Sequence, residues 1–183
     1  MPSSRNSELR KATLQKSFIS LRDKFEDAGL KWCIFAGGAA HAYGSSRAIT
    51  DIDILVKKSD LPKAEALGLS TDGRHVSFDS IDVVFELEIP VEGNVLRFFM
   101  DEEMEKRLRS GKLFGLTVPL VPLEDNIILK AILGRGPEQG KFDIQDICDM
   151  ARNPIDRDYL QRRISFYKVG KIVLPLLSKL AIL

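Results

Sequence analysis

Residues 35–54 decide how this chain folds, and they read FAGGAAHAYGSSRAITDIDI. One apolar segment ends at the glycine pair Gly37-Gly38, and a second begins between two carboxylates, Asp51 and Asp53. Because side chains alternate across a strand, the two carboxylates point to one face and the isoleucines to the other. Two carboxylates on one face at the start of a strand are typical of a divalent metal site beside a phosphate chain.

A third carboxylate, Asp82, lies in a later apolar run, residues 81–84 (IDVV). If this run is a strand next to the first pair, Asp82 joins Asp51 and Asp53. Three such groups close together repel one another and raise each other's pKa, a cost that one or two bound Mg²⁺ ions remove. The sequence therefore predicts a Mg²⁺ site, with Mn²⁺ as the second candidate ion. The alternative is three acids on solvated strand edges.

The glycine pair and the loop that follows it predict an anion site. Glycine lets the backbone come close to a ligand, and a helix expected over 39–43 would direct free N–H groups at it. Three polar residues follow in the loop before the second strand: Ser45, Ser46 and Arg47. Their hydroxyl and guanidinium groups are suited to phosphate oxygens. The alternative is an ordinary strand-to-helix turn followed by a solvated arginine.

Composition bounds the class of protein. The 183 residues suffice for one domain with a helical appendage. The 27 Lys and Arg nearly balance the 26 Asp and Glu, so a net charge of +1 gives no general reason to bind nucleic acid or membranes. No apolar leader follows Met1, and the most apolar window, 172–177, is too short to cross a bilayer. We therefore expect a cytoplasmic protein with no membrane partner.

The cysteines and histidines point away from other metal chemistry. Cys33 and Cys148 lie far apart in apolar contexts, without a CxxC pair, and are predicted to be reduced thiols. His41 and His75 are isolated, so no histidine and aspartate cluster accompanies the acids. This pattern disfavours a metal-dependent phosphohydrolase.

Periodicity predicts an α+β fold: a short mixed β-sheet flanked by helices, followed by an α-helical C-terminal region. An amphipathic helix is expected within 7–30, ended by Gly29. Further strands are expected over 31–36, 52–56, 74–78, 81–87 and 112–118. Further helices are expected over 59–66, 101–108, 123–133, 143–151 and 156–167. Residues 1–121 are predicted to form the core and 122–183 a helical region packed on it, with Pro175 interrupting the last segment.

The spacing of these motifs resembles the signature of the DNA-polymerase-β-like nucleotidyltransferase superfamily. Twelve residues separate Gly38 from the Asp51-Ile52-Asp53 motif, and Asp82 follows in a later apolar run. Within the superfamily, residues 37–53 are similar to a small prokaryotic branch that includes the AbiEii-type toxins of toxin–antitoxin systems. The similarity extends to positions in the C-terminal region: Pro122-Leu-Glu-Asp, Lys130, Arg135 and the run from Lys141.

The resemblance implies the nucleotidyltransferase fold and a role for each matched residue. It implies three catalytic, metal-binding carboxylates: Asp51, Asp53 and Asp82. By the same resemblance Asp82 accepts the proton of the attacking hydroxyl. It implies phosphate contacts from Gly37 and Gly38 and triphosphate contacts from Lys130 and Lys141.

The implied reaction moves a nucleoside monophosphate from a nucleoside triphosphate to an acceptor hydroxyl and releases pyrophosphate. RNA is one acceptor consistent with the resemblance, and a second copy of the chain or an antitoxin is an expected protein partner. The alternative is a catalytically silent nucleotide-binding or regulatory module of the same fold.

Overall fold

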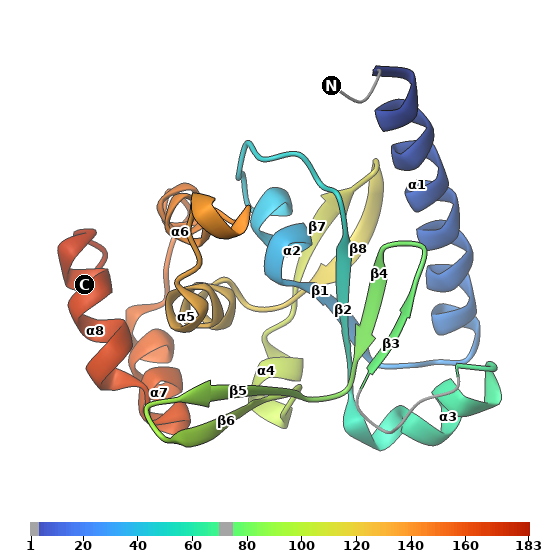
Figure 1. Ribbon diagram of the computed structural model, residues 1–183. Coiled ribbons are helices and arrows are strands. Elements are labelled where there is room, and N and C mark those ends of the chain that lie inside the picture. Colours follow the sequence, from blue (N-terminus) through green and yellow to red (C-terminus); the bar gives the residue numbers. More distant parts are fainter. Residues whose placement is uncertain (1–3, 70–74) are drawn as a thin grey trace.

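The computed structural model describes residues 4–69 and 75–183, which form a mixed α+β fold (Figure 1). The main sheet has six strands, in the order β3 (His75–Phe78), β4 (Ile81–Val84), β2 (Ile52–Val56), β1 (Trp32–Phe35), β8 (Leu116–Leu120) and β7 (Arg109–Leu113). The pairs β1–β2, β3–β4 and β7–β8 are antiparallel, whereas β1–β8 and β2–β4 are parallel. The predicted mixed sheet is therefore confirmed.

A separate two-stranded sheet, β5 (Leu87–Val91) with β6 (Asn94–Phe98), extends from the end of β4 toward the C-terminal helices (Figure 1). The helices are α1 (Ser4–Asp27), α2 (Ala36–Ala42), α3 (Leu61–Ala66), α4 (Glu102–Lys106), α5 (Leu123–Leu133), α6 (Asp143–Met150), α7 (Arg157–Tyr167) and α8 (Gly170–Lys179). Short 3₁₀ turns lie at Lys58–Asp60 and Pro137–Gln139.

Helix α1 covers one face of the sheet, and α2, α5 and α6 lie on the other (Figure 1). Phe18 and Phe25, seven residues apart on α1, both make edge-on ring contacts with Trp32 of β1. Gly29, at φ +63°, follows this helix in a conformation that glycine adopts without strain. The predicted N-terminal helix and its glycine stop are thus confirmed.

Two hairpins depart from the sequence prediction. The segment 112–118, predicted as one strand, reverses at Phe114 and Gly115, and both have positive φ, +51° and +78°. The run 81–87 is interrupted after Val84, and the next strand belongs to a hairpin that turns at Glu92 and Gly93, again with positive φ. Two-residue turns of this kind match the twist of the flanking strands. Neither turn begins with the asparagine or aspartate that marks it most clearly.

The glycine pair also differs from expectation. Helix α2 begins at Ala36, so Gly37 and Gly38 lie in its first turn and not in a loop before it. A Cβ atom on Gly38 would stand 2.8 Å from the Cγ2 atom of Ile34. Gly38 therefore allows α2 to pack closely on β1.

The C-terminal region is helical, as predicted. Helix α5 has the predicted bounds, and α6 and α7 differ from prediction by one residue at one end. Helix α8 continues through Pro175, contrary to the predicted interruption. Proline at this position removes only one hydrogen bond, to the carbonyl of Lys171 on the exposed first turn.

Helix α5 is the centre of the molecule. Its residues from Leu123 to Ala131 are all buried, and it contacts α2, α6, α7 and α8. One hydrophobic core runs through the sheet, α1 and the C-terminal helices. No helix in the described part of the chain is long and apolar enough to cross a membrane. The predicted division of the chain after residue 121 stays a prediction.

Candidate active site

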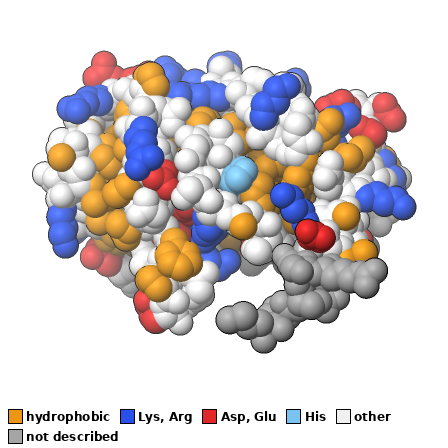
Figure 2. All heavy atoms as spheres, turned by 90° about the horizontal axis from the view of Figure 1, so that it is seen from above, with side chains coloured by type: hydrophobic (Ala, Val, Ile, Leu, Met, Phe, Trp, Pro, Cys, Tyr) orange, Lys and Arg blue, Asp and Glu red, His pale blue; other side chains and the backbone are white. Residues whose placement is uncertain are grey.

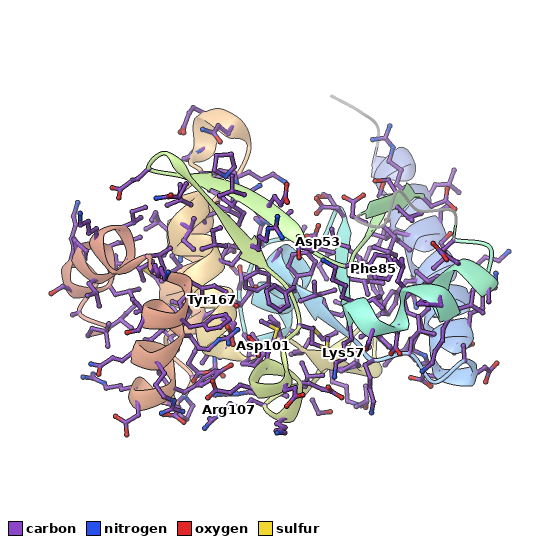
Figure 3. The ribbon with its side chains drawn as sticks, turned by 90° about the horizontal axis from the view of Figure 1, so that it is seen from below. Asp53, Lys57, Phe85, Asp101, Arg107 and Tyr167 are labelled. Atoms are coloured by element: carbon purple, nitrogen blue, oxygen red, sulfur yellow. The ribbon has the colours of Figure 1, made fainter. Side chains whose placement is uncertain are left out.

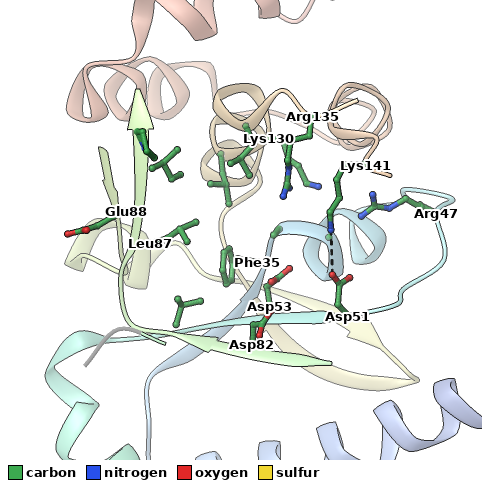
Figure 4. A pocket seen from close by; sticks show the side chains of 17 residues that line it. Phe35, Arg47, Asp51, Asp53, Asp82, Leu87, Glu88, Lys130, Arg135 and Lys141 are labelled. Atoms are coloured by element: carbon green, nitrogen blue, oxygen red, sulfur yellow. Dashed lines mark ion pairs between the residues drawn. The ribbon is translucent and has the colours of Figure 1, made fainter. Parts of the chain in front are cut away.

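The register of the sheet brings two of the predicted carboxylates together. Strands β2 and β4 are parallel neighbours, and Asp53 stands directly beside Asp82. On the other side of β2, Asp53 is paired with Phe35 of β1. Residues paired across neighbouring strands share a face of the sheet. Both carboxylates therefore project from the face that carries α2 and α5, opposite the face that α1 covers (Figure 4).

Asp51 completes the group from just before the start of β2. Its Oδ2 atom lies 3.6 Å from the Nζ atom of Lys141, and both side chains are a little more than one-third exposed. Asp51, Asp53 and Asp82 all line one pocket of about 390 Å³ (Figure 4). The expectation that a neighbouring strand places Asp82 beside Asp51 and Asp53 is confirmed.

The electrostatics of Asp53 reflect this grouping. Burial, and after it the negative charges of Asp51 and Asp82, raise the pKa of Asp53 to about 6 against the opposing effect of Lys141 and Lys130. An ionised Asp53 is therefore costly in the protein alone, and a cation close to it would remove that cost.

Basic side chains line the pocket on the side of the helices, opposite the carboxylates: Arg47, Lys130, Arg135 and Lys141 (Figure 4). Lys130 is buried, and its ammonium group donates to Asp143 and Asp146, both at 2.7 Å. Arg135 donates to Asp143 through its Nε atom at 2.9 Å. Arg135 is also partly exposed. Arg47, which lies 3.8 Å from Asp146, reaches the pocket from a loop, and Lys141 reaches it from the segment before α6.

Gly37 lines the pocket, and its lack of a side chain leaves room for Arg47. A Cβ atom there would stand 3.1 Å from the Nη2 atom of Arg47. The glycine thus lets the guanidinium lie against the backbone of α2.

Three predicted phosphate contacts lie outside the residues that line the pocket: Gly38, Ser45 and Ser46. The hydroxyl of Ser45 is buried and donates to Asp146 at 2.8 Å, so it ties the loop to α6. Ser46 is exposed. The contact of these three residues with a bound nucleotide stays a prediction. Asp146 binds both Ser45 and Lys130, and sequence spacing does not indicate this shared partner.

An apolar wall, which the sequence did not predict, lines another part of the pocket. It combines β1, β5 and α5 through Phe35, Leu87, Ile89, Leu129 and Leu133. The hairpin that carries Leu87 and Ile89 was not predicted. The glycine at its turn, Gly93, was the available signal.

Ring stacking joins this hairpin to β1 and to α7. The ring of Phe98 on β6 stacks on Phe35 and on Tyr167 of α7, with centroid distances of 6.1 and 5.7 Å. Tyr167 accepts a hydrogen bond from Arg163, which also binds Asp101 at the start of α4. Figure 3 shows Tyr167 and Asp101, which Arg163 joins, near each other. These contacts therefore hold the hairpin that carries Leu87 and Ile89 against β1 and α7.

The donor set is suited to a hard cation. Among the described residues, no three His, Cys, Asp or Glu side chains are arranged to hold one metal ion by themselves. Mg²⁺, however, is commonly held by one or two carboxylates and completes its shell with water and substrate phosphate oxygens. The neighbouring Asp53 and Asp82 offer only oxygen ligands, and the raised pKa of Asp53 marks a charge that needs compensation. These residues fit a Mg²⁺ or Mn²⁺ ion.

No protein-family model and no curated protein matches this chain.

Proposed function

We propose that this protein is a metal-dependent nucleotidyltransferase of the DNA-polymerase-β-like superfamily. It moves a nucleoside monophosphate from a nucleoside triphosphate to an acceptor hydroxyl and releases pyrophosphate. The observation that carries the proposal is the register pair of Asp53 and Asp82, which faces basic side chains across one pocket. The chain order β1, α2, β2, α3, β3, β4, with carboxylates on or beside β2 and β4, also supports the nucleotidyltransferase fold.

Asp53 and Asp82, together with Asp51, hold the metal ion in this proposal. When bound, Mg²⁺ neutralises charge on the phosphate oxygens and orients them. Arg47 and Lys141 bind non-bridging phosphate oxygens, because charge-assisted donors are strong partners for phosphate. Lys141 already contacts Asp51, so a triphosphate competes with that carboxylate for the ammonium group.

Asp82 accepts the proton of the acceptor hydroxyl as its oxygen attacks the α-phosphorus. The new bond joins that oxygen to phosphorus, and the bond to the pyrophosphate oxygen breaks. The hydroxyl of Ser77 donates to Asp82 and orients the carboxylate. The apolar wall at Phe35, Leu87 and Leu133 accommodates the base, which has an apolar face.

Pyrophosphate release tests the proposal. The protein is incubated with Mg²⁺, RNA and each of the four ribonucleoside triphosphates labelled at the α-phosphate. We expect labelled product and pyrophosphate in equal amounts, and loss of both in Asp53→Asn and Asp82→Asn. Asp158→Asn, at an exposed position on α7, is the matched control. Triphosphate binding without pyrophosphate release would instead identify a silent nucleotide-binding module.

The acceptor and the partners belong to the same proposal. Lysine and arginine side chains are spread among other residues over the face seen in Figure 2. On that face an RNA acceptor would be held by local contacts rather than by a long basic stripe. We place the reaction in the cytoplasm, where triphosphates and Mg²⁺ are available, with a second copy or an antitoxin as the expected protein partner.

A further inference from the structure

A strained backbone conformation lies at the edge of the pocket. Ala36, at the junction of β1 and α2, has φ +50°, in the left-handed region that non-glycine residues rarely adopt. The residue is buried and lines the pocket between Phe35 and Gly37. Strain of this kind persists only where the surroundings hold it in place, and it is concentrated at functional sites.

One side chain holds this junction through both of its polar backbone groups. Asn126, fully buried on α5, accepts a hydrogen bond from the N–H of Ala36 at 2.8 Å. Its amide nitrogen donates to the carbonyl of Ala36 at 3.1 Å and contacts the sulfur of Met150 at 3.3 Å. The residues are 90 positions apart in the sequence, so the contact joins the C-terminal helices to the start of the glycine motif.

We infer that Asn126 is a positioning residue that holds Ala36 in its left-handed conformation and thereby sets the pocket wall made by Phe35 and Gly37. The consequences for the site follow from the neighbours. Phe35 is the register partner of Asp53, and Gly37 is the surface against which Arg47 lies. A small rotation at Ala36 would therefore displace a phosphate-binding guanidinium relative to the carboxylates. The expected effect on triphosphate affinity rests on the proposed function.

Two substitutions test the inference together. Asn126→Ala removes both hydrogen bonds to Ala36, so we expect weaker triphosphate binding by about tenfold to a hundredfold, the range expected when a hydrogen bond to a charged group is lost. Ala36→Gly should restore a measurable part of that affinity in the Asn126→Ala background, because glycine adopts this conformation without a holding contact. Ala36→Gly is also measured in the parent background, so that the restoration is judged relative to the effect of the glycine alone.

The binding measurement uses a nonhydrolysable ATP analogue with Mg²⁺ and isothermal calorimetry. Tyr159→Phe is the matched control, because it removes a buried hydrogen bond to Asp125 on the same helix without reaching the pocket. Both Asn126→Ala and Tyr159→Phe should lower the melting temperature by about 2 to 8 °C. Only Asn126→Ala should weaken nucleotide binding. Equal affinities for the parent and Asn126→Ala, or no restoration by Ala36→Gly, would overturn the positioning role.

Hydrogen exchange keeps the inference separate from the proposed function. The N–H of Ala36 should be protected in the parent and in Tyr159→Phe and should exchange faster in Asn126→Ala, whether or not the protein binds a triphosphate. Unchanged protection at Ala36 would refute the holding contact. If no triphosphate binds the parent while the loss of protection occurs as expected, the proposed function fails and the contact with Asn126 is supported.

Discussion

At the scale of single residues, Asp53 is the most informative side chain. Burial first, and the charges of Asp51 and Asp82 second, raise its pKa to about 6. A group with this environment is unfavourable for stability when ionised and useful when a cation is bound. Asp53 therefore lowers the stability of the metal-free protein and is a metal ligand in the proposed chemistry.

This raised pKa predicts a pH-dependent gain in stability for Asp53→Asn without metal. The folded protein resists ionisation of Asp53, so the parent loses stability as the pH rises from about 4, near the unfolded pKa, to about 6. Above about pH 6 the variant should be more stable by up to about 3 kcal/mol, and below about pH 4 the difference should vanish. Urea unfolding at several pH values measures it. Asp158→Asn is the control, and an equal gain in that variant would contradict the explanation.

A second residue-scale prediction concerns Lys141. Replacing it with methionine removes the cation that contacts Asp51, so we expect the KM for the triphosphate to rise about tenfold to a hundredfold. Lys141→Arg retains the charge and should keep most of the affinity. Steady-state kinetics at low and high salt measure the change, which should be smaller at high salt. A KM that is unchanged in Lys141→Met would remove this residue from the phosphate site.

At the scale of elements, helix α5 holds the segments around the pocket in place through its buried polar side chains. Three of its buried polar side chains bind different parts of the molecule: Asn126 binds the β1–α2 junction, Asp125 binds α7, and Lys130 binds α6. Burial raises the pKa of Asp143, but the bonds from Arg135 and Lys130 outweigh it, and the pKa is lowered. The helix thus connects the pocket to the C-terminal helices through charges that are paired.

Lys130→Met should therefore destabilise the fold strongly. The substitution leaves Asp143 and Asp146 without their shared ammonium group, and removing one partner from a buried ion pair typically costs about 3 to 5 kcal/mol. The free energy of unfolding from urea titration is the measurement. Lys171→Met, at an exposed position on α8, is the matched control. A loss below about 1 kcal/mol in Lys130→Met would show that the two carboxylates find other compensation.

At the scale of the whole molecule, local patterns predicted most helices and strand β2, which begins directly after Asp51, because these elements have clear periodicity and clear ends. The two hairpins were missed because their turns begin with phenylalanine and glutamate, which rarely adopt positive φ. The bond from Ser45 to Asp146 and the contact of Asn126 with Ala36 join residues about 100 and 90 positions apart. Such pairings depend on tertiary packing, which local spacing does not encode.

Locating a bound metal ion in the whole protein tests most directly whether Asp53 and Asp82 form a metal site. Mn²⁺ is titrated, with a nonhydrolysable triphosphate present, while backbone amide signals are recorded by NMR. We predict that the signals of Asp53, Asp82 and Gly37 broaden first and that Asp53→Asn abolishes this selectivity. Broadening that begins elsewhere, or that is unchanged in Asp53→Asn, would contradict the claim that these carboxylates form a metal site.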